Sequence, residues 1–188
     1  IASAWNPENS RIVFITKALG DHTNELPTLL RQGSPVTVEG PYGCFDFDDG
    51  HTRQIWIGAG IGITPAAAIL EDLSRRQPDR TVRLFHADTS FDHHALYQGL
   101  RRQVLAMSDA RAQNWYEQGA DEAPTLHPAR SGFMDLSDVE LPDDAEVFMC
   151  GPLPFMQAIR HQLIARGVPA DRIQYEVFGP DLWAQNPD

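Results

Sequence analysis

Little in this chain of 188 residues points to secretion, membrane insertion or metal binding. It has only two cysteines, Cys44 and Cys150, and no CxxC pair, so it lacks a disulfide framework and suits a reducing compartment. No apolar run approaches the roughly 20 residues that span a bilayer. HExxH and Cys/His ligand spacings are also missing. We therefore expect no membrane segment within the chain and no metal site, the adjacent His93 and His94 included.

Basic residues are too few for a nucleic-acid-binding protein. The chain has 15 Lys and Arg against 26 Asp and Glu, and its formal net charge of −11 repels a phosphate backbone. The first residue is Ile1, with no basic and apolar leader after it, which predicts a processed or excised piece. Apolar residues make up 42% and charged residues 22%, so we expect an ordinary globular fold.

The start of the chain and the remainder differ in pattern. Residues 1–50 predict β structure, with strands over Arg11–Thr16 and Pro35–Glu39 and a short helix over Asp21–Arg31 between them. The rest alternates strands with helices, which is typical of a parallel α/β sheet. The predicted strands there are 54–58, 81–86, 146–150 and 172–178, and the predicted helices are 64–76, 92–107 and 153–166. Residues 118–131 predict a loop, and the polar stretch 46–53 predicts a domain boundary.

A glycine-rich loop carries the strongest chemical signal. It runs from Gly58 to Pro65, between a predicted strand and a predicted helix, with alternating glycines at Gly58, Gly60 and Gly62. Glycines let backbone N–H groups approach a ligand, and a helix start favours an anion such as a pyrophosphate. We expect Thr64 to be the N-cap and Pro65 the first helical residue. The spacing differs from GxGxxG, and the alternative is a tight turn without a ligand.

Three further motifs lie at predicted element ends. Cys150, Gly151 and Pro152 follow a strand, and ligands of open α/β sheets gather at the carboxyl ends of strands; the alternative is a buried structural thiol. Gly20–Thr23 precedes a helix and is either a second anion site or ordinary capping. Tyr175–Pro180 places an aromatic ring and a carboxylate at a strand end, to face a planar cofactor or simply to pack.

Taken together, these motifs resemble the ferredoxin–NADP reductase superfamily. That resemblance implies the last strands of an antiparallel flavin-binding β-barrel in residues 1–50. It implies an NAD(P)-binding domain in residues 51–188, a parallel sheet of five or six strands with helices on both faces. Ile1–Ser3 resembles the residues directly after the flavin motif of the family, and Gly40–Gly43 resembles the turn that closes the barrel.

The resemblance also implies roles for individual residues. The reaction centre comprises Cys150, Glu176 and Phe178, of which Phe178 covers the flavin ring. The cofactor-binding residues are Gly20, His22 and Thr23 for FAD, and Gly58, Gly60, Gly62, Thr64, Pro65, Gly151 and Pro152 for the nicotinamide dinucleotide. Asp88 follows the predicted strand 81–86, where a carboxylate accepts a ribose hydroxyl and repels a 2′-phosphate, so we expect NADH rather than NADPH.

The implied activity is hydride transfer from NAD(P)H to FAD, followed by single-electron transfer to a haem or another acceptor. Gly20–Thr23 and Val38–Gly43 resemble membrane ferric reductases and NADPH oxidases, whereas Phe85–Ala87, Gly132–Leu136 and Cys150–Met156 resemble flavohaemoglobin, the nitric oxide dioxygenase. We favour the first branch. In both, the haem lies in a domain or an electron-acceptor protein outside this chain.

A third hypothesis, of another class, is a non-catalytic dinucleotide-binding or scaffolding module. We expect the chain in the cytoplasm or at the cytoplasmic face of a membrane protein.

Overall fold

The computed structural model describes residues 1–8, 10–40, 42–43, 45, 47, 52–94, 96–123 and 129–177. Its centre is one six-stranded sheet in the order β4-β3-β2-β1-β5-β6, in which all the neighbouring strands are parallel. The strands are β1 (Arg53–Ala59), β2 (Thr81–Ser90), β3 (Ala110–Gln118), β4 (Arg130–Ser131), β5 (Glu146–Cys150) and β6 (Ile173–Glu176).

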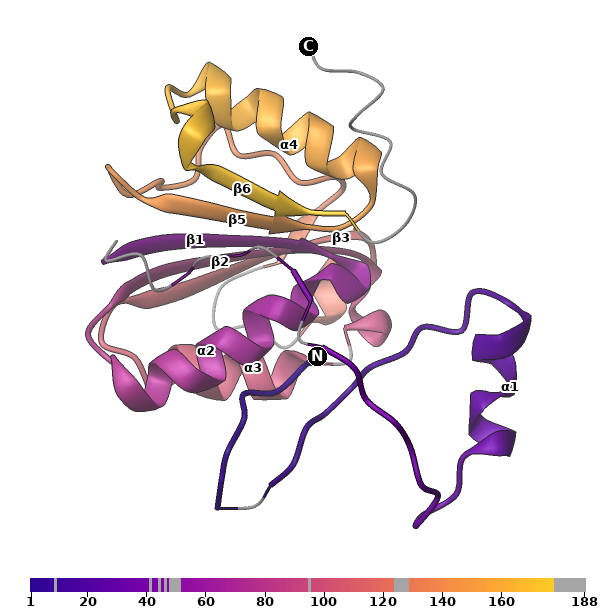
Figure 1. The fold of residues 1–188 in the computed structure, drawn as a ribbon. Coiled ribbons are helices and arrows are strands. Elements are labelled where there is room, and N and C mark those ends of the chain that lie inside the picture. Colours follow the sequence, from indigo (N-terminus) through magenta and orange to yellow (C-terminus); the bar gives the residue numbers. More distant parts are fainter. Residues whose placement is uncertain are drawn as a thin grey trace.

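Helices cover both faces of the sheet. The helices α2 (Thr64–Arg76) and α3 (Tyr97–Leu105) lie on one face, and α4 (Leu153–Ala165) lies on the other (Figure 1). The described residues also form four short 3₁₀ turns: η1 (Gly60–Ile63), η2 (Phe91–His93), η3 (Ala120–Glu122) and η4 (Ala170–Arg172). This arrangement confirms the expected parallel α/β sheet with helices on both faces. Among the described helices, none has the length and apolar character needed to cross a membrane.

The central strand β1 is buried on both faces, which explains its nearly continuous apolar sequence. Trp56 stacks on Phe148 of β5 with ring centroids 4.3 Å apart, in the apolar layer that α2 and α3 cover. Ile57 and Met149 point to the opposite face, in the layer that contains the buried residues of α4. The two apolar layers therefore hold β1 and β5 at the centre of the fold.

Some elements agree with the sequence pattern and others do not. The helix α2 and the strand β5 have the predicted bounds. The helix α3 is shorter than predicted, because residues 91–93 form η2 before it. Strand β3 was not predicted, since its glutamine, asparagine and arginine residues have little β propensity. It forms because β2 and β4 pair with its two edges.

The N-terminal region contains α1 (Asp21–Leu29) and an isolated bridge between Asn6 and Arg11. The predicted strands over 11–16 and 35–39 are wrong, because the described residues there pair with no neighbouring strand. Ile12 is 43% exposed and Phe14 51% exposed, as expected of extended chain without a covering partner. Ala4 N–H donates to the Glu71 carboxylate of α2 at 2.8 Å, which ties the start of the chain to the sheet domain.

The carboxyl ends of β1 and β5 meet at a close backbone contact. A Cβ added at Gly62 would overlap the Cys150 carbonyl and lie 2.9 Å from the Gly151 nitrogen. A Cβ at Gly58 would lie 2.8 Å from the Ile63 Cα. Both glycines are therefore required by the packing of the protein against itself, which brings η1 against the end of β5.

We expect Gly62→Ala to lower the free energy of unfolding by roughly 1–3 kcal/mol, because the backbone must move to admit the methyl group. Gly99→Ala in α3 is the matched control: nothing lies within 4 Å of its Cβ position, and alanine favours the helix by roughly 0.5–1 kcal/mol. Urea unfolding of the two variants measures both changes. Equal stability of Gly62→Ala and the wild type would contradict the close contact.

Candidate functional site

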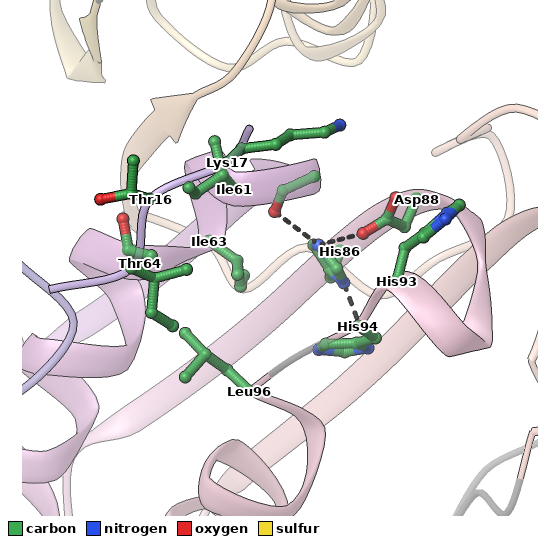
Figure 2. Close-up of a pocket in the computed structure, with 12 residues that line it drawn as sticks. Thr16, Lys17, Ile61, Ile63, Thr64, His86, Asp88, His93, His94 and Leu96 are labelled. Atoms are coloured by element: carbon green, nitrogen blue, oxygen red, sulfur yellow. Dashed lines mark hydrogen bonds and ion pairs between the residues drawn. The ribbon is translucent and has the colours of Figure 1, made fainter. Parts of the chain in front are cut away.

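A pocket of about 220 Å³ opens at the carboxyl end of β1 and β2 (Figure 2). Three parts of the chain line it: residues 15–17 of the N-terminal region, η1 with the start of α2, and the end of β2 with His93, His94 and Leu96. The strand order places β2, β1 and β5 side by side. The pocket therefore lies at the edge of the sheet where an open α/β fold binds ligands.

The glycine loop presents one open glycine to this pocket. Gly60 lines the pocket with a left-handed φ of 52°, and a Cβ there would meet nothing within 4 Å. Gly58 and Gly62, by contrast, serve internal packing. Of the three glycines that the sequence singled out, Gly60 is thus the one where a ligand can approach the backbone closely.

The start of α2 differs from the prediction in one detail. Ile63, not Thr64, is the N-cap; Thr64 is the first helical residue and Pro65 the second. No side chain caps this end, because η1 continues directly into the helix. The Thr64 N–H already donates to the Ile61 carbonyl of η1 and Pro65 has no N–H, so this end attracts an anion through the partial positive charge of the helix dipole. Thr64 lines the pocket, so an anion there would face the helix start.

The second predicted loop lies against the first. Cys150 pairs in register with Gly58 of β1, and Gly151 packs against Ala59. Pro152 is the N-cap of α4. The structure therefore brings the two loops together at one edge of the sheet, as the sequence predicts.

Cys150 is 3% exposed, and burial raises the pKa of its thiol to about 12, with the Glu176 carboxylate adding to the effect. The thiol is consequently neutral at physiological pH. Glu176 lies opposite Cys150 in the register of β5 and β6, and its Oε1 accepts a hydrogen bond from Phe45 N–H at 3.3 Å. Phe178, the third predicted residue of the reaction centre, lies outside the described residues, as does Cys44.

Asp88 lies inside a strand rather than in a loop. The sequence predicts that the strand ends at His86, but β2 continues to Ser90. The Asp88 side chain is 6% exposed and lines the pocket, with its Oδ2 3.9 Å from His86 Nε2. The longer strand thus holds a carboxylate at the pocket wall, on the strand next to the glycine loop.

Gly20, His22 and Thr23 lie apart from this pocket. Gly20 is the N-cap of α1, which extends away from the sheet (Figure 1). The Thr23 hydroxyl accepts hydrogen bonds from the N–H groups of Leu19 and Gly20, each at 3.0 Å, and so closes the turn itself. Only the segment that leads to this turn, residues 15–17, reaches the pocket.

Sequence reasoning missed several residues that line the pocket: Lys17, His86, His93 and His94. The adjacent histidines gave only a poor metal signal, and the described residues contain no group of three metal-ligating side chains. Lys17 sits on a segment far from the loop in sequence, so no local pattern could reveal it. The one available signal is a histidine near the end of a buried strand, where polar residues are rare.

The model of the oxidoreductase NAD-binding domain matches residues 56–161. The flavohemoprotein of Oceanobacillus iheyensis is 31% identical over 167 residues, which cover 86% of this chain and 40% of that protein. The flavohemoprotein of Vibrio cholerae is 32% identical over 153 residues, 80% of this chain and 37% of that protein. The chain thus spans about two fifths of the length of these curated relatives.

Solved structures agree with the sequence relatives. The flavohem-like FAD/NAD-binding domain of nitric oxide dioxygenase from Vibrio cholerae has a TM-score of 0.76 and 31% identity, covering 86% of this chain and 65% of that one. A flavohemoglobin from Malassezia yamatoensis with bound FAD and heme has a TM-score of 0.72 and 27% identity, covering 88% and 43%. The similarity therefore extends beyond the part of the chain that the family model matches.

We expect Cys150 to resist thiol reagents, because the thiolate is the reactive form and burial keeps the thiol neutral. In a Cys44→Ser background, Cys150 is the sole thiol. Ellman's reagent at pH 8 should label it slowly in the native protein and fully within minutes in denaturing urea. Equally fast labelling in both states would show that the thiol is accessible and its pKa not raised.

Proposed function

The chain belongs to the oxidoreductase NAD-binding domain family, and we propose that it is the nicotinamide-binding reductase part of a flavohaemoprotein. NADH would reduce FAD, and the electrons would pass singly to a haem in another part of the parent protein. The observation that carries the proposal is the pocket in which the open Gly60 loop and the buried Asp88 carboxylate face one ligand volume. The flavohemoprotein relatives support the haem acceptor.

The pocket offers complementary groups for a dinucleotide. When bound, the dinucleotide supplies a hydride. The Gly60 backbone and the positive end of the α2 dipole would bind the pyrophosphate, and Lys17 brings a positive charge to the same pocket. Asp88 would accept hydrogen bonds from the adenosine ribose. Catalysis in such a site depends mainly on orientation, so none of these residues need transfer a proton.

The reaction centre would lie beside this pocket, at the ends of β5 and β6. There the neutral Cys150 thiol and Gly151 would border the nicotinamide, with Glu176 next to them in the sheet. We assign residues 51–188 to the nicotinamide domain and residues 1–50 to the flavin side. The start of α1 would face the FAD pyrophosphate, because its first N–H groups have no acceptor within the helix.

The membrane ferric reductase branch is the second candidate. The motifs Gly20–Thr23 and Val38–Gly43 support this branch. The flavohemoprotein relatives support the flavohaemoglobin branch instead. Both branches share the hydride chemistry of this chain and differ in where the haem lies. We place either parent's reductase part in the reducing environment of the cytoplasm, which suits the free Cys150 thiol.

We expect Gly60→Asn to raise the Kd for NADH at least tenfold, because a side chain would occupy the open volume beside the loop backbone. Asparagine tolerates a left-handed φ, whereas the β-branched valine would be strained there. Gly167→Asn is the matched control, since Gly167 also has a positive φ of 86° and open space at its Cβ position. Calorimetric titration with NADH measures both. If the two variants bind NADH alike, Gly60 does not face the dinucleotide.

We expect the wild type to bind NADH more tightly than NADPH by roughly tenfold, because the Asp88 carboxylate repels a 2′-phosphate. Asp88→Asn should narrow this ratio, mainly by improving NADPH binding. Asp92→Asn makes the same charge change at an exposed residue of η2 and should leave the ratio unchanged. A wild-type preference for NADPH, or an equal effect of both substitutions, would remove Asp88 from cofactor selection.

A further inference from the structure

A buried polar chain connects three elements behind the glycine loop. His86 is 0% exposed, His94 7% and Tyr116 0%. His86 Nε2 lies 3.1 Å from the Gly60 carbonyl, and its Nδ1 lies 3.3 Å from His94 Nδ1. His94 Nδ1 in turn lies 2.8 Å from the Tyr116 hydroxyl. Figure 2 shows His86 between His94 and Asp88 at the pocket wall.

Both imidazoles are neutral. Burial and, to a smaller extent, the neighbouring His86 together lower the pKa of His94 to about 3. Burial also lowers the pKa of His86, and this outweighs the opposite effects of the Gly60 carbonyl and the Asp88 carboxylate. Each ring therefore carries one N–H and one nitrogen lone pair. The position of that single proton decides which nitrogen donates and which accepts in each hydrogen bond.

The Gly60 carbonyl determines the tautomers. A carbonyl oxygen can only accept, so His86 must carry its proton on Nε2 and a lone pair on Nδ1. His94 must then donate from Nδ1, because two facing lone pairs 3.3 Å apart would repel, and the Tyr116 hydroxyl oxygen 2.8 Å away accepts from the same N–H. Its Nε2 is left as a lone pair, and no donor to it is found among the described residues.

The hydrogen bond from His86 constrains the peptide that joins Gly60 and Ile61. Gly60 has a left-handed φ of 52°, a conformation without strong intrinsic preference in glycine. In a trans peptide, C=O and N–H point in opposite directions, so a carbonyl held by His86 turns the Ile61 N–H away from that ring. The Gly60–Ile61 peptide begins η1, and the histidine adds a side-chain hydrogen bond that favours this one orientation of it.

We propose that His86, itself oriented by His94 and Tyr116, is the positioning residue for the Gly60–Ile61 peptide of the dinucleotide-binding loop. The neutral Nε2–H tautomer holds the loop in its binding orientation before the ligand arrives, which reduces the ordering that binding must supply. This inference rests on the proposed dinucleotide binding. It adds a residue that does not need to contact the reacting atoms.

Two substitutions of His86 separate the hydrogen bond from the packing. His86→Leu fills much of the space without a donor, and we expect it to raise the Kd for NADH about tenfold. His86→Gln restores an N–H donor near the Nε2 position and should bind NADH within about threefold of the wild type. Gln54→Leu is the control: Gln54 is also 0% exposed and hydrogen-bonded, but it lies at the opposite end of β1. It should lower the melting temperature and leave the Kd unchanged.

Nitrogen-15 NMR of the histidine-labelled wild-type chain at pH 7 tests the tautomers without any ligand. We expect His86 as Nε2–H and His94 as Nδ1–H. The Nδ1–H tautomer at His86, wild-type affinity in His86→Leu, or equal weakening by His86→Leu and His86→Gln would each overturn the positioning role. If the wild type fails to bind NADH while the tautomers are as expected, the proposed function itself fails and the inference falls with it. Tight NADH binding by the wild type with the wrong tautomer overturns this inference alone.

Discussion

The site depends on one close backbone contact, between Gly62 of η1 and the Cys150–Gly151 peptide at the end of β5. Parallel pairing of β1 with β5 brings these two strand ends to the same edge, and the missing Cβ lets the loops touch. Because the contact is made of backbone, it is stiff. It keeps the pocket-facing Gly60 on one side of the loop and the buried thiol on the other.

The second feature that organises this edge of the sheet is that its buried thiol and imidazole side chains are uncharged. The Cys150 thiol and the His86 and His94 imidazoles are all driven to their neutral forms by desolvation. The described charges of the pocket are then Asp88 and Lys17, which line its wall from different parts of the chain. A neutral interior with one carboxylate and one ammonium group suits a ligand that carries both hydroxyls and phosphates. It also allows hydrogen bonds to orient the loop without competing ion pairs.

The local signals of the sequence were reliable where a residue's role depends on its neighbours in the chain. The bounds of α2 and β5 and the position of the glycine loop followed from periodicity and from Gly and Pro punctuation. The same reasoning failed where pairing partners decide. Strand β3 forms from polar residues because two strands flank it, whereas the apolar segments over 11–16 and 35–39 form no strand without such neighbours. The N-cap of α2 was wrong by one residue, because η1 runs directly into the helix.

By itself, the sequence determined the α/β alternation, the two loops at strand ends and the likeness to a flavin-dependent reductase family, since strand, turn and helix signals are local. Only the tertiary structure decided which groups line the pocket. It separated Gly60 from Gly58 and Gly62, extended β2 to hold Asp88 in the wall, and brought Lys17 and the His86–His94 pair to the same pocket. Lys17, the glycine loop and the His86–His94 segment lie far apart in the chain, and their meeting depends on the fold, because packing and hydrogen bonding act through space rather than along the sequence.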